Sequence, residues 1–90
     1  LDSVREGRGV GTALITAVID RARQVRCTRV WLLTTNDNVN ALRFYQKRGF
    51  VLAALHREAV AHARQIKPEI PLSGEYGIPI RDELELEMML

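Results

Sequence analysis

The chain has little with which to build covalent cross-links. Cys27 is the only cysteine among its 90 residues, so neither a disulfide framework nor a cysteine-based metal site is available. A chain of this length buries a smaller fraction of its surface than a larger domain does, and no disulfide compensates for that. A lone thiol is typical of a reducing compartment, which predicts a cytoplasmic location. We expect no bound metal.

The chain also lacks a large excess of either charge sign, and it lacks long hydrophobic runs. The formal net charge is +2, which is too weak for a general nucleic-acid binder. No apolar run approaches the roughly 20 residues that cross a bilayer, and no signal peptide is visible. We therefore expect neither nucleic acid nor membrane among the partners. Apolar residues make up 47% of the chain, which is enough for the core of one small domain or a piece of one.

Hydrophobic periodicity predicts an alternation of helices and strands. The first helix is expected over residues 10–26, where apolar residues recur at spacings of four or three and form one stripe. The stripe consists of Val10, Leu14, Val18, Ala22 and Val25. Further along we expect a strand at 30–34, a helix at 38–48 with Gly49 as its left-handed cap, a strand at 50–55, and a weaker helix at 59–66 that Pro68 ends.

The last segments complete a layered α/β (α+β) fold. Residues 69–81 contain several prolines and glycines and are expected to be loop. From residue 83, glutamates alternate with apolar residues, which predicts a half-buried antiparallel strand. The fold class that follows is a mixed sheet flanked by helices.

Three glycines alternate over five positions directly before the first helix. A turn of this kind exposes successive backbone N–H groups, and the helix adds its own unpaired donors and the positive end of its dipole. Such a site favours an anion, most often phosphate. The predicted anion-binding residues are Gly7, Arg8, Gly9, Val10, Gly11 and Thr12. The alternative is a tight turn that only caps the helix; the pattern is neither a Walker loop nor a full dinucleotide fingerprint.

A second dense segment begins at Asn38. Asn38 and Tyr45 are seven residues apart, so on a helix they face the same way, roughly 10 Å apart along the axis. Ala41 lies between them. A face with an amide, a small residue and a phenol suits an extended ligand arm. The alternative is that Asn38 only caps the helix and Tyr45 only packs in the core.

Together the two segments resemble the cofactor half of the GNAT acetyltransferases, which move an acetyl group from acetyl-CoA to an amine. Residues 6–11 are similar to the family's loop, Arg/Gln-x-x-Gly-x-Gly/Ala, with Glu6 where the family prefers Arg or Gln. The family's second motif is present as Asn38, Ala41, Phe44, Tyr45, Lys47, Gly49 and Phe50. The resemblance is close over residues 1–55 and looser over the last strand.

The resemblance implies an N-acetyltransferase with acetyl-CoA as cosubstrate and a small-molecule or peptide amine as acceptor. In it the glycine loop would bind the pyrophosphate, Asn38 the pantetheine arm, and Arg43, Lys47 or Arg48 the remaining phosphate. Tyr45 would protonate the departing thiolate, because a tyrosine phenol carries its proton at neutral pH. No convincing general base is found. The candidates by composition alone are His56, His62, Glu83, Glu85 and Glu87.

The same resemblance implies a single partial GNAT domain over residues 1–90. Residues 1–55 would form the acetyl-CoA-binding core, 57–81 a helix-and-loop insertion, and 82–90 the C-terminal strand. The family's fold begins with several strands and two helices before the glycine loop, so we expect a truncated chain that lacks the acceptor half. Copies are expected to associate through the exposed sheet edge. The alternatives are a non-catalytic CoA-binding or regulatory module and a purely structural fragment.

Overall fold

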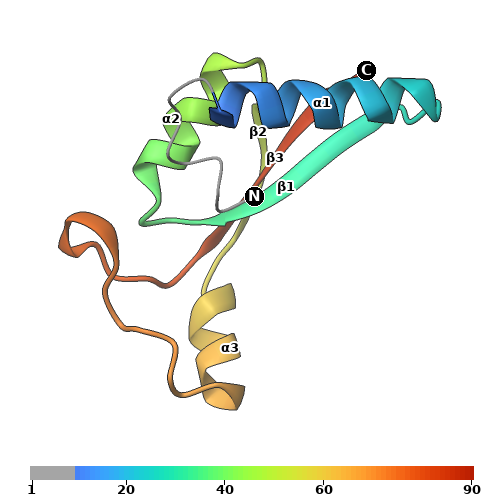
Figure 1. Ribbon diagram of the computed structural model, residues 1–90. Helices are drawn as coiled ribbons and strands as arrows, with labels where there is room; N and C mark the ends of the chain where they lie inside the picture. The colour runs from blue at the N-terminus through green and yellow to red at the C-terminus, as the bar shows by residue number, and fades with distance from the viewer. Residues whose placement is uncertain (1–9) are drawn as a thin grey trace.

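A computed structural model describes residues 10–90, with side chains from residue 13 onward. Helices and strands alternate as the periodicity predicts, with small shifts at their ends (Figure 1). Their bounds are α1 (Val10–Gln24), β1 (Arg29–Thr35), α2 (Val39–Lys47), β2 (Val51–His56), α3 (Ala59–Ile66), the 3₁₀ turn η2 (Glu75–Gly77) and β3 (Glu83–Met89).

The last strand of the chain is the middle strand of the described sheet. The order is β1-β3-β2, and β3 runs antiparallel to both neighbours. Leu86 lies near the middle of β3 and is in register with Leu32 of β1 and Leu52 of β2. The expected antiparallel C-terminal strand is confirmed. The expectation of a mixed sheet is not met among these strands, because β1 and β2, which are parallel to each other, are separated by β3.

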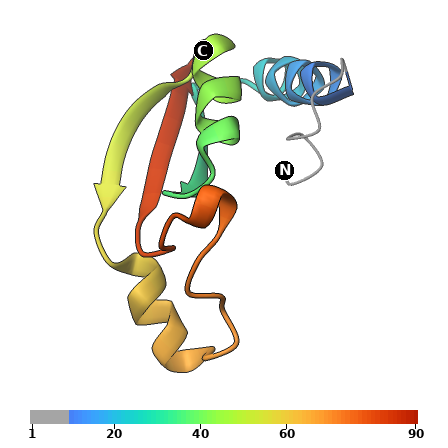
Figure 2. The ribbon, with the colours of Figure 1, turned by 90° about the vertical axis from the view of Figure 1, so that its left-hand side faces the viewer.

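The core lies between one face of this sheet and the helices α1 and α2. Figure 2 shows both helices on the same side of the sheet, while α3 lies beyond its end. The buried residues that form one cluster there are Ile15, Leu32, Ala41, Tyr45, Phe50 and Leu86. Helices and strands thus pack as two layers, the arrangement expected for a chain whose elements each have one apolar face.

The buried side of α1 differs from the predicted stripe. Leu14, Val18 and Val25 are 42%, 43% and 51% exposed, whereas Ile15 is 2% exposed and Ile19 packs against the core. The two apolar rows are one residue apart, and successive residues on a helix differ by about 100°. Periodicity therefore fits both rows, and only packing against the sheet selects between them.

The predicted left-handed cap of α2 is confirmed at Gly49. Its φ is +100°, and the chain turns there so that the N–H of Phe50 donates to the carbonyl of Tyr45 at 3.1 Å. This bond satisfies one of the carbonyls that a helix end leaves unpaired. It also brings the buried Phe50 ring beside that of Tyr45. The turn at Gly49 therefore ends α2 and also places Phe50 in the core beside it.

The opposite face of the sheet carries an ion-paired cluster instead of plain surface. Arg29 on β1 contacts Glu85 and, at 2.5 Å, Glu87 on β3. Glu85 also lies 3.3 Å from the Nε2 of His56 on β2. The Glu85 side chain is only 19% exposed. Strand pairing thus places a cation from β1 beside these two glutamates, which are ion-paired and not merely solvated.

Acid is expected to weaken this face of the sheet. The hydrogen bonds from Arg29 and then His56 hold the pKa of Glu85 below its ordinary value. The unfolded chain then takes up this proton at a higher pH than the folded chain does, so stability is retained above about pH 4.3 and falls as pH drops through the folded-state pKa. Urea unfolding at pH 6 and pH 3 measures the loss.

The Glu85→Gln variant serves as the comparison for that measurement. It keeps the shape of the side chain and removes the titration, so its unfolding midpoint should depend less on pH than that of the unaltered chain. An identical acid dependence in both proteins would contradict a contribution from Glu85.

Residues 57–82 connect β2 to β3 and extend beyond the end of the sheet (Figures 1 and 2). We call them the β2–β3 connection. Arg64 on α3 holds it together: the guanidinium donates to the carbonyls of Ile70, Pro71 and Ile80 at 3.1, 2.8 and 2.8 Å. One side chain thereby ties the outgoing helix to the returning limb. The loop expected over 69–81 is confirmed, with η2 as its one turn of 3₁₀ helix among the described residues.

Candidate functional site

The amino end of α2 is built by a tight turn that follows β1. The N–H of Asn38 donates to the carbonyl of Thr35 at 3.1 Å, and the N–H of Val39 donates to that of Asp37 at 2.8 Å. Asn38 is the N-cap, and its Oδ1 accepts from the N–H of Ala41 at 3.3 Å. The capping role considered for Asn38 is therefore present. Its Nδ2 makes no hydrogen bond within the described part of the chain, so a donor remains for a ligand.

Tyr45 lies on the buried side of α2. It is 4% exposed, and its ring makes edge-to-face contacts with Phe44 and Phe50 at centroid distances of 5.3 and 5.6 Å. Ala41, one turn nearer the cap, is 6% exposed. The core role considered for Tyr45 is therefore present as well. Asn38, Ala41 and Tyr45 form one apolar helix side with an amide at its end, which agrees with the face that the spacing predicts.

Half of the predicted phosphate site falls outside the described residues. Gly7, Arg8 and Gly9 lie there. The backbones of Val10, Gly11 and Thr12 form the first turn of α1, as predicted. N–H groups in a first turn have no intrahelical acceptor and point along the axis, which suits a phosphate group. These donors are the part of the predicted anion site that the structure describes.

The basic residues near the end of α2 are of two kinds. Lys47, in the last turn, is exposed, as expected for a side chain that would reach a peripheral phosphate. Arg48 instead turns back over Phe44, with its guanidinium carbon 3.9 Å from the ring centroid and its Nη1 donating to the Phe44 carbonyl at 3.3 Å. Arg48 therefore serves the packing of α2, whereas Arg43 and Lys47 are both exposed.

None of the base candidates is shaped for that role. Glu85 is a weaker base than an ordinary glutamate, because its pKa is lowered by Arg29 and then by His56. His56 is bound to that same carboxylate. Glu87 is ion-paired with Arg29 at 2.5 Å, and His62, on α3, is exposed. Glu83 lies in register with Thr35 of β1 and His56 of β2, at the end of the sheet where the β2–β3 connection begins. The general base stays unassigned, as the sequence suggested.

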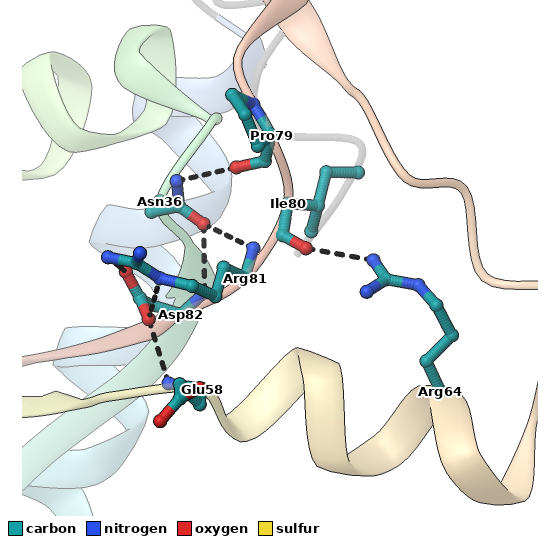
Figure 3. A network of polar contacts seen from close by, with 7 residues as sticks. All are labelled: Asn36, Glu58, Arg64, Pro79, Ile80, Arg81 and Asp82. Carbon is teal, nitrogen blue, oxygen red and sulfur yellow. Dashed lines mark hydrogen bonds and ion pairs between the residues drawn. The ribbon is translucent and has the colours of Figure 1, made fainter.

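Sequence reasoning missed the polar network between the turn after β1 and the β2–β3 connection (Figure 3). Asn36 Oδ1 accepts from the N–H groups of Arg81 and Asp82, both at 2.9 Å, and Asn36 Nδ2 donates to the Pro79 carbonyl at 2.8 Å. Asp82 accepts in turn from the N–H of Glu58 at 2.8 Å. The only signal in the sequence is the Asn-Asp-Asn run directly after a strand.

The network keeps Asp82 ionised. The Arg81 guanidinium donates to both of its oxygens, at 2.9 and 3.0 Å, and Asp82 is 6% exposed. These bonds, then that from Glu58, hold the pKa of Asp82 below its ordinary value.

A cavity of about 170 Å³ is lined by Asn36, Pro79 and Arg81. This volume is below the several hundred Å³ typical of ligand pockets, so it would accept only a small group.

Gly74 is required by the close approach of Asp37. A Cβ at residue 74 would lie 2.0 Å from Asp37 Oδ2, so Gly74→Ala should destabilise the chain by about 1–3 kcal/mol through overpacking. Its φ is −122°, so the left-handed backbone region plays no part in this expectation. Urea unfolding measures the loss.

Gly77→Asn provides the control for Gly74→Ala. Gly77 has φ +71° and nothing within 4 Å of its Cβ position, and asparagine tolerates this backbone region. It should change stability by less than about 1 kcal/mol. Equal unfolding midpoints for the two variants would contradict the clash with Asp37.

Comparison with known proteins decides the family. The model of the Acetyltransferase (GNAT) family matches residues 2–50, more than half of the chain. The chain belongs to the GNAT family. The match includes both the glycine segment before α1 and the whole of α2, so the predicted resemblance is confirmed.

GNAT relatives agree in sequence and in structure. The chain is 55% identical over 84 residues to the uncharacterized protein YdhI of Bacillus subtilis (strain 168), covering 93% of this chain and 52% of that protein. It superposes with a TM-score of 0.79 and 27% identity on the IAA acetyltransferase from Bacillus cereus ATCC 14579, covering 93% of this chain and 53% of that one. It also superposes on a GNAT family acetyltransferase from Elizabethkingia anophelis with acetyl-CoA bound, with a TM-score of 0.76 and 27% identity. That superposition covers 93% of this chain and 52% of the other.

The chain thus spans about half the length of the proteins that it matches. Its α/β fold corresponds to that half of each solved structure. Within residues 10–90, no helix has the length and apolar content needed to cross a bilayer. The described side chains contain no cluster of three or more histidines, cysteines or carboxylates that could hold a metal ion.

Proposed function

We propose that this chain is the acetyl-CoA-binding half of an N-acetyltransferase that acts on a primary amine. The observation that carries the proposal is the arrangement on α2. Asn38 caps the helix and keeps its Nδ2 for a ligand, and the small Ala41 separates it from Tyr45. The acetyl-CoA-bound GNAT structure, on which 93% of this chain superposes, supports the same assignment.

The binding roles follow from the donors available. The amides from Gly7 to Thr12, with Arg8, would bind the pyrophosphate, and the first turn of α1 supplies part of that donor set. Asn38 Nδ2 would donate to an amide carbonyl of the pantetheine arm, and Ala41 leaves room for the arm. Lys47, exposed at the other end of α2, would pair with the remaining phosphate.

Acetyl-CoA supplies an activated thioester when bound. A neutral amine attacks its carbonyl carbon; a C–N bond forms, the C–S bond breaks, and the proton that the amine releases replaces, through solvent, the one given to the sulfur. We assign the proton for the departing sulfur to the Oη of Tyr45, a general acid at neutral pH.

A non-catalytic CoA-binding or regulatory module is the second candidate. It is favoured by the ring contacts of Tyr45 with Phe44 and Phe50, which give this tyrosine a packing role without chemistry. Association of copies through the sheet edge stays a prediction; β1 and β2 are the edges of the described sheet. The division into a core over 1–55 and an insertion over 57–81 also stays a proposal.

Titration with CoA by calorimetry tests the proposal, followed by an assay of thiol release from acetyl-CoA with a panel of primary amines. The unaltered chain should bind CoA with a Kd of about 1–100 μM, typical of substrates. Gly9→Val should weaken it by at least 10-fold, since a side chain there blocks the backbone donors. Absence of CoA binding would refute both candidates, and binding without acetyl transfer would favour the module.

A further inference from the structure

Asn36 connects the turn after β1 to the returning limb of the β2–β3 connection. Its own N–H donates to the carbonyl of Asp82 at 3.0 Å, and its side chain makes three more bonds to residues 79–82 (Figure 3). An asparagine side chain has two acceptor and two donor positions, so three of the four are in use. Asn36 therefore fixes the turn after β1 against residues 79–82, which lie 43 or more positions further along the chain.

Asp37, the next residue, makes a second connection. It is 6% exposed, and its Oδ1 accepts from the hydroxyl of Thr35 at 2.5 Å, while Oδ2 accepts from the N–H of Glu75 at 3.1 Å. Gly74 lies so close that it has no room for a Cβ. A buried carboxylate needs such donors, because an unsatisfied one is strongly destabilising. The turn η2 is thus fixed against the start of α2.

Both residues lie in the turn that sets the backbone of Asn38. A third contact, between Asn40 Nδ2 and the Tyr76 hydroxyl at 3.0 Å, lies just beyond it on the exposed side of α2. Contacts from the β2–β3 connection therefore fall on residues 36, 37 and 40, on both sides of Asn38. Movement of the connection would move the cap.

We propose that Asn36 and Asp37 are positioning residues for Asn38, and that the β2–β3 connection fixes the amino end of α2 for the pantetheine arm. This inference rests on the proposed function. Asn36 and Asp37 have no contact with the ligand themselves. Their bonds hold the Asn38 amide in one place, so the arm meets a preorganised donor and less freedom is lost on binding.

The test compares a ligand that has the arm with one that lacks it. CoA contains pantetheine, whereas adenosine 3′,5′-bisphosphate has only the nucleotide portion. Asn36→Ala and Asp37→Asn should each weaken CoA binding by about 10-fold, the effect of one well-placed hydrogen bond. Binding of the bisphosphate should change by less than about 2-fold. All titrations are run well below the Tm of each variant, so that only folded protein is measured.

Two further variants separate positioning from general loosening. Arg64→Ala releases the inner bonds of the connection but leaves those of Asn36 and Asp37 in place, so it should weaken CoA binding less than either Asn36→Ala or Asp37→Asn does. Gln65→Ala, exposed on α3, should change nothing. Unchanged CoA binding in Asn36→Ala and Asp37→Asn, equal losses for both ligands, or an equal loss in Arg64→Ala would overturn the inference. If the unaltered chain binds neither ligand, the proposed function itself fails, and the inference with it.

Discussion

Tyr45→Phe is expected to lower acetyl transfer by about 10²–10⁴-fold while leaving CoA affinity unchanged. The change removes one hydroxyl and keeps the ring, so the edge-to-face contacts with Phe44 and Phe50 persist and the helix stays packed. What is lost is the proton that we assign to the departing sulfur. Steady-state kinetics with acetyl-CoA and the best amine, together with CoA titration, separates the two quantities.

The matched control is Tyr76→Phe. Tyr76 is 72% exposed, and its hydroxyl contacts only Asn40 among the described residues, so the same chemical change should leave turnover within about 2-fold. Full turnover in Tyr45→Phe would remove Tyr45 from the reaction. A large loss of CoA affinity in that variant would assign the hydroxyl to binding instead.

The sequence was most informative where one local signal was strong. The helix α2 could be placed from Asn38 at its start and Gly49 at its end, and both act as predicted, as the cap bond to Ala41 and the φ of +100° show. The alternation of glutamate with leucine and methionine predicted β3 for the same reason. A cap and a period of two each depend on a few neighbouring residues, which sequence shows directly.

Features that depend on distant segments could not be predicted. Leu14 and Ile15 are equally apolar neighbours on α1, and only contact with the sheet decides that Ile15 is buried. Glu85 becomes part of an ion-paired cluster because β1 places Arg29 beside it. The bonds of Asn36 span more than 40 residues. In each case the partner is set by strand order, which local patterns do not contain.

The candidate site divides in the same way. The residue types on α2 and in the glycine segment could be read from spacing and from the resemblance to GNAT proteins. What spacing did not give is how Asn38 is held, since that depends on the β2–β3 connection. The chemistry of the site is thus carried by short motifs, whereas its geometry depends on contacts between segments far apart in the chain.

Leu86→Ala is expected to destabilise the chain by about 3–5 kcal/mol, the upper range for loss of a buried leucine. Leu86 is fully buried at the centre of the middle strand, between Leu32 and Leu52. The truncation removes three carbons from a completely buried site, and the cavity that remains adds to the loss. Small domains have about 5–15 kcal/mol in total, so much of this variant's stability would disappear. Urea unfolding at constant temperature measures it.

Leu55→Ala tests whether position or residue type is responsible. Leu55 lies on the edge strand β2 and is 56% exposed, so the same truncation there should cost less than about 1 kcal/mol. A similar loss at both positions would mean that Leu55 is covered in solution, for example by another copy at the sheet edge. A small loss at Leu86 would contradict a core centred on β3, because Leu86 shares one buried cluster with residues of α1, α2 and β1.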